Sequence, residues 1–228
     1  TGGGVKNVAG FFAGETFVVM NGKIVTDVDL GAAVAHHRAC GAEATMVLKP
    51  DPHAAQWGAI GVDERGRVRR FLGSKGPWTD VTDDAVSEHM FTGIHVLEPT
   101  FLERLPEGPC CIVRAGYVPA FADGAALAGY VHRGYFWDHS TPSRLLEGNL
   151  NLVSGRGRAA HPPGPARGVH ESATAHPDAR LAESVLVGAG ARIEAGAQLG
   201  PDVVIGSGAH VAEGVRLSHT VVLAGAPV

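Results

Sequence analysis

The sequence predicts an α/β domain followed by a left-handed parallel β-helix. The first part rests on apolar runs that stop at turn residues, such as Phe17 to Met20 before Asn21 and Gly22. An unbroken apolar run is typical of a buried strand in a parallel sheet that helices cover on both faces. The second part rests on an aliphatic residue that recurs at every sixth position near the carboxyl end. We therefore expect two architectures in one chain of 228 residues.

Composition and charge exclude several classes of protein. The chain has 19 Lys and Arg against 23 Asp and Glu, so it lacks the basic footprint of a nucleic-acid-binding protein. No apolar run approaches the roughly 20 residues that span a bilayer, and the first residues are unlike a signal peptide. Three cysteines, Cys40, Cys110 and Cys111, do not make a disulfide framework, and we expect the adjacent pair to pack rather than react. A reducing cytoplasm fits these observations best.

The first helix and strand frame a predicted ligand crevice. The chain begins with the glycine-rich segment Thr1 to Gly4 and a short helix, which composition alone would assign to a frayed terminus. In open α/β sheets, ligands lie outside the carboxyl ends of the strands, so Asn21, Gly22 and Lys23 are expected to face the crevice. The next helix begins at Asp29, a good N-cap, and ends near Gly41.

The remaining elements of the α/β part follow in order. Their bounds come from apolar runs, turn residues and caps. They are a strand at 44–49, a hairpin of 57–63 with 67–72, a polar connection at 76–88, a strand at 90–97, helices at 99–105 and 117–121, a strand at 127–131, and a helix that begins at Thr141 and Pro142. Prolines within 155–167 indicate a linker.

The carboxyl-terminal part repeats with a period of six. The repeated aliphatic residues are Leu181, Val187, Ile193, Leu199, Ile205, Val211, Leu217 and Leu223, and the position two before each is Ala or Val. Such hexads are typical of a left-handed parallel β-helix in which each short strand points one aliphatic residue inward. An acyltransferase can be built on such a coil. However, nothing interrupts the hexads to form an acyl-donor loop, and His210 and His219 are expected to be exposed turn residues.

Several segments resemble sugar-1-phosphate nucleotidyltransferases, the NDP-sugar pyrophosphorylases. Met20 to Lys23 with Thr26 to Leu30 is similar to the family's "NGD…TDLDL" segment, and Gly134 to Pro142 to its "GYWxD[IV]GTP" motif. The hairpin, the strand Met90 to Leu97 and the Thr1 to Gly4 loop also match, in the family's order. The loop and that strand look closest to the mannose-1-phosphate guanylyltransferase and muramic-acid-1-phosphate uridylyltransferase types. The resemblance implies a Rossmann-like, GT-A-like mixed sheet flanked by helices over residues 1–154, a linker at 155–168 and the β-helix at 169–228. It covers the family without its first strand, phosphate loop and early helices, so the first domain is expected to be incomplete at its amino end.

The resemblance also implies the site residues. Nucleotide binding is expected at Thr1, Gly2, Gly3, Gly4, Asn21 and Gly22, sugar binding at Thr92 and Gly93, catalysis at Lys23, Lys75 and Asp138, and Mg²⁺ binding at Asp138. Four positions depart from the family pattern: Lys23 replaces a metal-binding Asp, Phe91 replaces Asn, Lys75 lies one place beyond its expected position, and His139-Ser140 replaces an apolar residue and Gly. Either Lys23 offsets phosphate charge or it pairs with Asp138 and closes an unused site.

Two functions follow from the resemblance. The first is nucleotidyl transfer from a nucleoside triphosphate to a sugar 1-phosphate, giving an NDP-sugar such as GDP-mannose and pyrophosphate. The second is a catalytically inactive nucleotide-binding or sugar-binding member, or a regulatory subunit of the same family. In either case we expect no nucleic-acid or membrane partner, and possible self-association through the β-helix.

Overall fold

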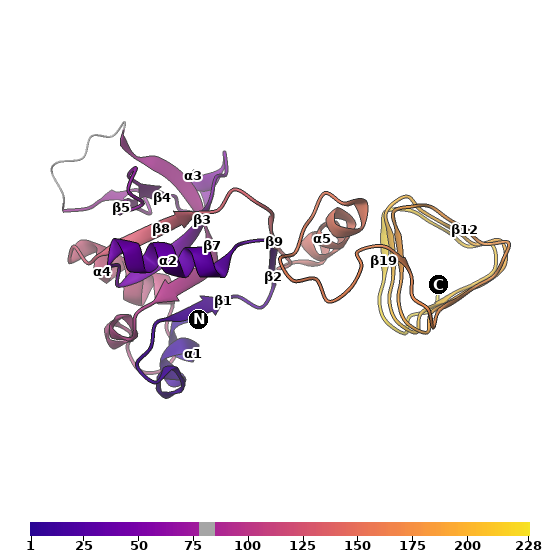
Figure 1. The fold of residues 1–228 in the computed structure, drawn as a ribbon, viewed down its shortest axis with the longest axis horizontal. Helices are drawn as coiled ribbons and strands as arrows, with labels where there is room; N and C mark the ends of the chain where they lie inside the picture. Colours follow the sequence, from indigo (N-terminus) through magenta and orange to yellow (C-terminus); the bar gives the residue numbers. More distant parts are fainter. Residues whose placement is uncertain (78–84) are drawn as a thin grey trace. The chain divides into compact units, whose positions relative to one another are not determined.

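The computed structural model describes residues 1–77 and 85–228, apart from the side chain of Trp57, and divides into two compact units (Figure 1). The first unit comprises residues 1–22 and 28–134, and the second comprises residues 23–27 and 135–228. This division groups residues 135–154 with the carboxyl-terminal coils, whereas the sequence places a boundary after residue 154. The domain boundaries expected from the sequence, at residues 154 and 168, stay a prediction. The connection expected at 76–88 lies partly outside the described residues.

A mixed sheet forms the centre of the first unit. Its described strands are β1 (Phe17–Met20), β3 (Ala44–Lys49), β4 (Ile60–Val62), β5 (Val68–Phe71), β6 (Ser74–Lys75), β7 (Ser87–Leu97) and β8 (Leu127–Val131). They lie in the order β6-β5-β4-β7-β3-β8, and β1 also pairs with β7. β3 and β8 are parallel, and the other pairs are antiparallel. The expected mixed sheet and the 57–72 hairpin are confirmed.

The prediction that residues 17–20 form a fully buried parallel strand is wrong. β1 pairs antiparallel with β7, with Phe17 opposite Leu97 and Met20 opposite Ile94. Phe17 is buried, but Met20 is 45% exposed. In the described part of the chain β1 has a single strand neighbour, so its apolar run packs at a sheet edge rather than in a sheet interior.

Helical segments cover this sheet. They are α1 (Gly2–Asn7), the 3-10 turn η1 (Ala9–Phe12), α2 (Leu30–Cys40), α3 (Ala54–Trp57), the 3-10 segment η3 (Pro99–Arg104), the π-helical turn η4 (Val113–Tyr117) and α4 (Val118–Ala122). The predicted ends of α2 are confirmed: Asp29 Oδ1 accepts the Ala32 N–H at 2.9 Å, and Gly41 has a φ of 56°. Phe101 and Tyr117 are fully buried within the core of this unit.

The second unit begins with a two-stranded ribbon and a helix. β2 (Ile24–Thr26) pairs antiparallel with β9 (Phe136–Asp138), and α5 (Pro142–Ser154) follows. Thr141 caps α5 as predicted, because its Oγ1 accepts the Arg144 N–H at 3.2 Å. None of the described helices is both long and apolar enough to cross a membrane.

The hexads form a three-sided parallel coil, which Figure 1 shows as a triangular path. Its strands are β10 (Gly168–Val169), β11 (Thr174–Ala175), β12 (Arg180–Leu181), β13 (Val185–Val187), β14 (Arg192–Ile193), β15 (Gln198–Leu199), β16 (Val203–Ile205), β17 (His210–Val211), β18 (Arg216–Leu217) and β19 (Thr220–Val222). The core contains the hexad residues together with the Ala or Val two positions before, as in Val185 with Val187 and Ala191 with Ile193. This confirms the predicted β-helix.

The prediction that Leu223 is the last residue of the inward stack is wrong. Leu199 and Ile205 are six residues apart, but their partners on the next coil, Leu217 and Val222, are five apart. The corner between β18 and β19 is therefore one residue shorter, and it turns through His219 with a φ of 47°. As a result Val222 is buried and Leu223 is 64% exposed.

One face of the coil carries an apolar outer surface that α5 contacts. Its outward positions are Leu186, Val204 and Val221, all half-buried. The outward positions of the other two faces are polar: Thr174, Arg192 and His210, and Arg180, Gln198 and Arg216. α5 lies against β16 and β19 and buries Leu150 and Val153. His210 therefore lies within a strand and not in a turn as predicted.

Candidate functional site

The β2–β9 ribbon brings together Lys23 and Asp138, which are 115 positions apart in the sequence. Ile24 lies opposite Asp138, and the His139 backbone N–H donates to the Lys23 carbonyl at 2.9 Å. The Lys23 Nζ atom lies 3.1 Å from Asp138 Oδ2. The Lys23 side chain is 48% exposed and that of Asp138 is 27% exposed, so the ion pair lies at the surface of the second unit.

Asp138 is held in its ionised form. Burial by itself would raise the pKa of Asp138, but hydrogen bonds from Lys23 and Ser140 and the charges of Lys23 and Arg144 outweigh it and lower that pKa. The other carboxylate oxygen, Oδ1, is buried and has no hydrogen-bond partner in the described part of the chain. Buried polar atoms are nearly always partnered, so this oxygen is an unsatisfied acceptor.

Asp138 is positioned by two residues, Arg144 and Trp137, that the sequence analysis did not identify. Arg144 Nε donates to the Asp138 carbonyl at 2.7 Å, and its guanidinium lies 4.7 Å from the centre of the Trp137 ring. Trp137 Nε1 donates back to the Arg144 carbonyl at 2.7 Å. Arg144 is the third residue of α5, so its place beside the Thr141-Pro142 cap was a signal available in the sequence.

The residues present do not fit the divalent metal that the family resemblance implies. Mg²⁺ requires oxygen ligands in near-octahedral geometry. Of the two matched positions, Asp138 supplies oxygen and Lys23 supplies an ammonium group. Over residues 1–77 and 85–228, no group of three or more His, Cys, Asp or Glu side chains is placed to hold a metal ion.

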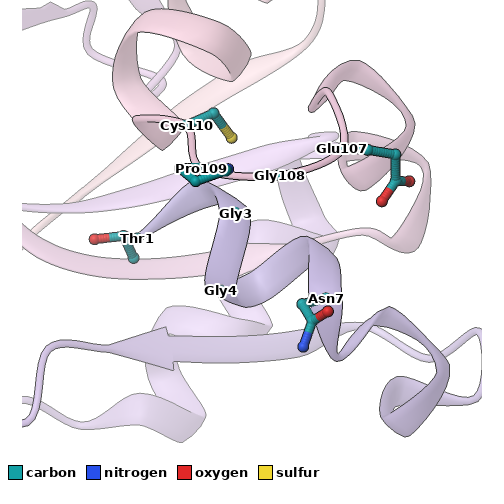
Figure 2. Close-up of a pocket in the computed structure, with 8 residues that line it drawn as sticks. All are labelled: Thr1, Gly3, Gly4, Asn7, Glu107, Gly108, Pro109 and Cys110. Atoms are coloured by element: carbon teal, nitrogen blue, oxygen red, sulfur yellow. The ribbon is translucent and has the colours of Figure 1, made fainter.

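The glycine-rich segment at the start of the chain lines a cavity in the first unit. The cavity has a volume of about 500 Å³ and lies between Thr1, Gly3, Gly4 and Asn7 on α1 and the segment from Glu107 to Cys110 (Figure 2). The Gly3 N–H donates to the Cys110 carbonyl at 3.3 Å. A Cβ at Gly3 would collide with the Gly108 carbonyl, and one at Gly2 would lie 2.8 Å from Cys110 Sγ.

These contacts separate the four residues of the segment. Gly2 and Gly3 are required for the close approach of α1 to residues 108–110, whereas a Cβ at Gly4 would meet no atom within 4 Å. Thr1 is the N-cap of α1 but makes no side-chain capping bond. The binding of a nucleotide by this segment stays a prediction. Packing does not explain why residue 4 is a glycine.

Thr92 and Gly93 lie in β7. The Thr92 hydroxyl is buried and donates to the Val47 carbonyl at 2.7 Å. Gly93 has a φ of 79°, in the left-handed region that favours glycine, opposite the point where the β3–β7 register shifts. Both residues therefore have a structural role in the strand, and their expected contact with a sugar is not tested by these contacts.

Lys75, Asn21 and Gly22 lie outside β7, the strand that carries Thr92 and Gly93. Lys75 is exposed on β6, at one end of the strand order, and pairs in register with Arg70. Asn21 and Gly22 follow β1, and a Cβ at Gly22 would meet no atom within 4 Å. The structure thus groups Lys23 with Asp138, and Thr1 with Gly3 and Gly4.

Comparison with known families identifies two regions of the chain. Residues 1–106 match the family described as "Nucleotidyl transferase". Residues 184–219 match "Bacterial transferase hexapeptide (six repeats)". These matches confirm the resemblance and the repeats found in the sequence.

The chain is similar to proteins named as guanylyltransferases and a uridylyltransferase of sugar 1-phosphates. The chain is 35% identical over 207 residues to a mannose-1-phosphate guanylyltransferase of Mycobacterium tuberculosis, covering 86% of this chain and 54% of that protein. It is 30% identical over 179 residues to a probable mannose-1-phosphate guanylyltransferase 2 of Arabidopsis thaliana, covering 77% and 47%. It is 29% identical over 139 residues to a UTP--glucose-1-phosphate uridylyltransferase of Synechocystis, covering 59% and 34%. The chain thus spans about half or less of the length of these relatives.

Proposed function

Because the chain carries a nucleotidyl transferase domain followed by bacterial transferase hexapeptide repeats, we propose that the protein transfers a nucleotidyl group from a nucleoside triphosphate to a sugar 1-phosphate. A phosphate oxygen of the sugar phosphate attacks the α-phosphorus, the bond to the β-phosphate oxygen breaks, and pyrophosphate leaves. Little covalent chemistry falls to the protein in such reactions, so its residues act by position and charge.

The family matches carry the proposal, and we assign the reaction to the Lys23–Asp138 pair. Both residues occupy positions matched to the charged centre of the family, and they come from segments far apart in the chain. The structure places their charged atoms 3.1 Å apart. Arg144 adds a second cation that acts on Asp138. We assign to Lys23 and Arg144 the stabilisation of phosphate charge, and to Asp138 the positioning of Lys23.

For the substrates we propose guanosine triphosphate and mannose 1-phosphate. Two of the relatives named above are described as mannose-1-phosphate guanylyltransferases, and one as a uridylyltransferase acting on glucose 1-phosphate. We assign nucleotide binding to Thr1 to Gly4, Asn21 and Gly22. We assign sugar binding to Thr92 and Gly93, and binding of the sugar phosphate to Lys75. A cytoplasmic location and self-association through the β-helix belong to the same proposal.

The family generally uses a divalent metal, and Mg²⁺ on Asp138 is the expectation that the resemblance gave. Mg²⁺ in such sites neutralises phosphate charge. The pairing of Asp138 with Lys23 does not fit that expectation, and no step of the proposed reaction is assigned to a metal at this position.

The test is product formation by the protein in its full natural length. Each of GTP, UTP and ATP is combined with mannose 1-phosphate or glucose 1-phosphate, and pyrophosphate release is followed with chromatography of the NDP-sugar. The proposal predicts release that requires both substrates, fastest with GTP and mannose 1-phosphate. Hydrolysis of the triphosphate without a sugar product would contradict it.

A catalytically inactive binding or regulatory subunit is the second candidate. The ion pair between Lys23 and Asp138 favours it, because a paired site can be a closed one. This candidate predicts that no substrate pair releases pyrophosphate while GTP or the sugar nucleotide still binds in calorimetry. It also predicts that the protein changes the turnover of an active relative when the two are mixed.

A further inference from the structure

We propose that the Lys23 ammonium is the resident cation of this site and binds a phosphate group directly, in the place where a divalent ion would otherwise lie opposite Asp138. The inference rests on the proposed function only for the identity of the phosphate compound. The preference for a lysine over a metal rests on the contacts and charges of the second unit, at the two positions that the resemblance matches to metal-binding aspartates.

The charge of the site favours an anion. Two carboxylates at the matched positions would give the pair a charge of −2 and attract a divalent cation. Lys23 and Asp138 instead sum to zero, and Arg144, whose Nε contacts the Asp138 carbonyl, brings the group to +1. A phosphate group therefore meets net attraction here, whereas a free divalent cation does not.

The geometry leaves the ammonium available to a ligand. A lysine ammonium has three N–H donors, and in the described part of the chain the ion pair with Asp138 is the contact that Lys23 Nζ makes. The Lys23 side chain is 48% exposed, so the remaining donors are not shut away from ligands. Asp138 thus orients the ammonium without enclosing it.

The same contact disfavours a metal. A Mg²⁺ ion bound to Asp138 Oδ2 at about 2.1 Å would lie within about 5 Å of the ammonium. The ammonium has no lone pair with which to coordinate the ion. A Mg²⁺ ion at this place would therefore be repelled by the ammonium and would gain no ligand from it.

Manganese binding tests the first half of the proposal without any turnover. The full-length protein and its Lys23→Asp and Lys23→Met variants are titrated with Mn²⁺, and bound ion is read by electron paramagnetic resonance. Lys23→Asp is expected to gain a Mn²⁺ site with affinity at least about tenfold above that of the parent, since it supplies a second carboxylate. Lys23→Met removes the charge but adds no ligand, so it is expected to show no such gain.

Phosphate binding tests the second half. Inorganic pyrophosphate is titrated calorimetrically in EDTA into the parent, Lys23→Met and the control Arg180→Met, which removes an exposed cation from β12. Loss of a charge-assisted hydrogen bond is expected to weaken pyrophosphate binding by Lys23→Met at least about tenfold. Arg180→Met is expected to bind like the parent. Thermal unfolding of each variant verifies that it is folded.

Three results would overturn the inference: Mn²⁺ binding by the parent equal to that of Lys23→Asp, pyrophosphate binding by the parent that appears only with Mg²⁺, or equal binding by Lys23→Met and the parent in EDTA. These readouts are independent of product formation. If no NDP-sugar is made but the Mn²⁺ and pyrophosphate results are as expected, the proposed function fails and the assignment of Lys23 stands.

Discussion

Gly148 of α5 lies directly against the imidazole of His139. A Cβ at residue 148 would collide with His139 Nε2 and would lie 2.6 Å from Trp137 Cδ1. The resemblance leads to an apolar residue at position 139, and the larger imidazole is accommodated because the facing helix position has no side chain. The position of Asp138, between Trp137 and His139, therefore depends on a glycine in the next element.

We predict that Gly148→Ala moves Asp138. Alanine favours the helix by up to about 1 kcal/mol, but overpacking against two rings costs about 1 to 3 kcal/mol. The net expectation is lower stability of the second unit and a loss of pyrophosphate binding. Chemical denaturation and calorimetry measure the two effects.

Two further variants make this prediction specific. Glu147 is exposed on the same helix, so Glu147→Ala is expected to leave stability and pyrophosphate binding unchanged. His139→Val creates space, so the double variant with Gly148→Ala is expected to recover stability relative to Gly148→Ala, with a coupling energy of about 0.5 to 3 kcal/mol. Additive effects of the two changes would show that the close contact does not determine the position of Asp138.

The carboxyl-terminal coil offers a matched pair of hexad positions. Ile205 is 1% exposed within the coil, so Ile205→Asp buries an unpaired carboxylate and is expected to abolish cooperative folding of the second unit. Leu223 follows the same sequence pattern but is 64% exposed, so Leu223→Asp is expected to leave the unfolding transition unchanged. Circular dichroism on heating checks both. Equal effects of the two substitutions would contradict the shortened corner.

Acid should destabilise the first unit through His95. Burial, with a smaller contribution from the amino-terminal charge, lowers the pKa of His95 from 6.5 to about 3, and its Nδ1 lies 2.9 Å from the buried Tyr117 hydroxyl. Below pH 6.5 the unfolded chain takes up a proton that the folded chain does not, so stability falls as the pH falls toward 3. At pH 5 the expected loss is about 2 kcal/mol relative to pH 7.5.

Urea titrations at the two pH values provide the measurement. His95→Gln removes the titrating group, so its loss of stability between pH 7.5 and pH 5 is expected to be smaller than that of the parent by about 2 kcal/mol. The other titratable residues are the same in both proteins. An identical pH dependence would show that His95 is not held neutral by burial.

The Cys111 thiol should react faster than the Cys40 thiol. The backbone N–H groups of Arg114 and Val113 and the charge of Arg114 lower its pKa, and its side chain is exposed. Burial raises the pKa of Cys40. We therefore predict that iodoacetamide at pH 7.5 modifies Cys111 before Cys40, as followed by peptide mass spectrometry. Faster modification of Cys40 would contradict this ordering.

Local signals predicted the elements whose stability is local. The ends of α2 and α5 depend on Asp29 and Thr141, whose side chains bond to backbone groups three residues away. The β-helix was equally predictable, because each hexad repeats the same inward position. These features require no knowledge of which distant segments meet.

Long-range features were predicted less well. The antiparallel partner of β1 lies in β7, about 75 positions away, and no local pattern specifies it. The last corner is one residue shorter, but Leu223 still follows the sixfold spacing in the sequence, so the pattern did not reveal the change. Cys111 was expected to pack rather than react. The lowered pKa of its thiol comes from backbone groups, which residue types do not reveal. For Lys23 the sequence left two roles open, and the structure adds the ion pair with Asp138 while its role stays a proposal.

The most direct test of the account is the rate of pyrophosphate release from GTP and mannose 1-phosphate by the full-length protein and its Asp138→Asn and Lys23→Met variants. The account predicts that each variant loses at least about tenfold in kcat/KM, because each removes a charge from the pair that orders the phosphate groups. Arg180→Met is expected to match the parent. Parent-like rates in both Asp138→Asn and Lys23→Met would contradict the placement of nucleotidyl transfer at this pair.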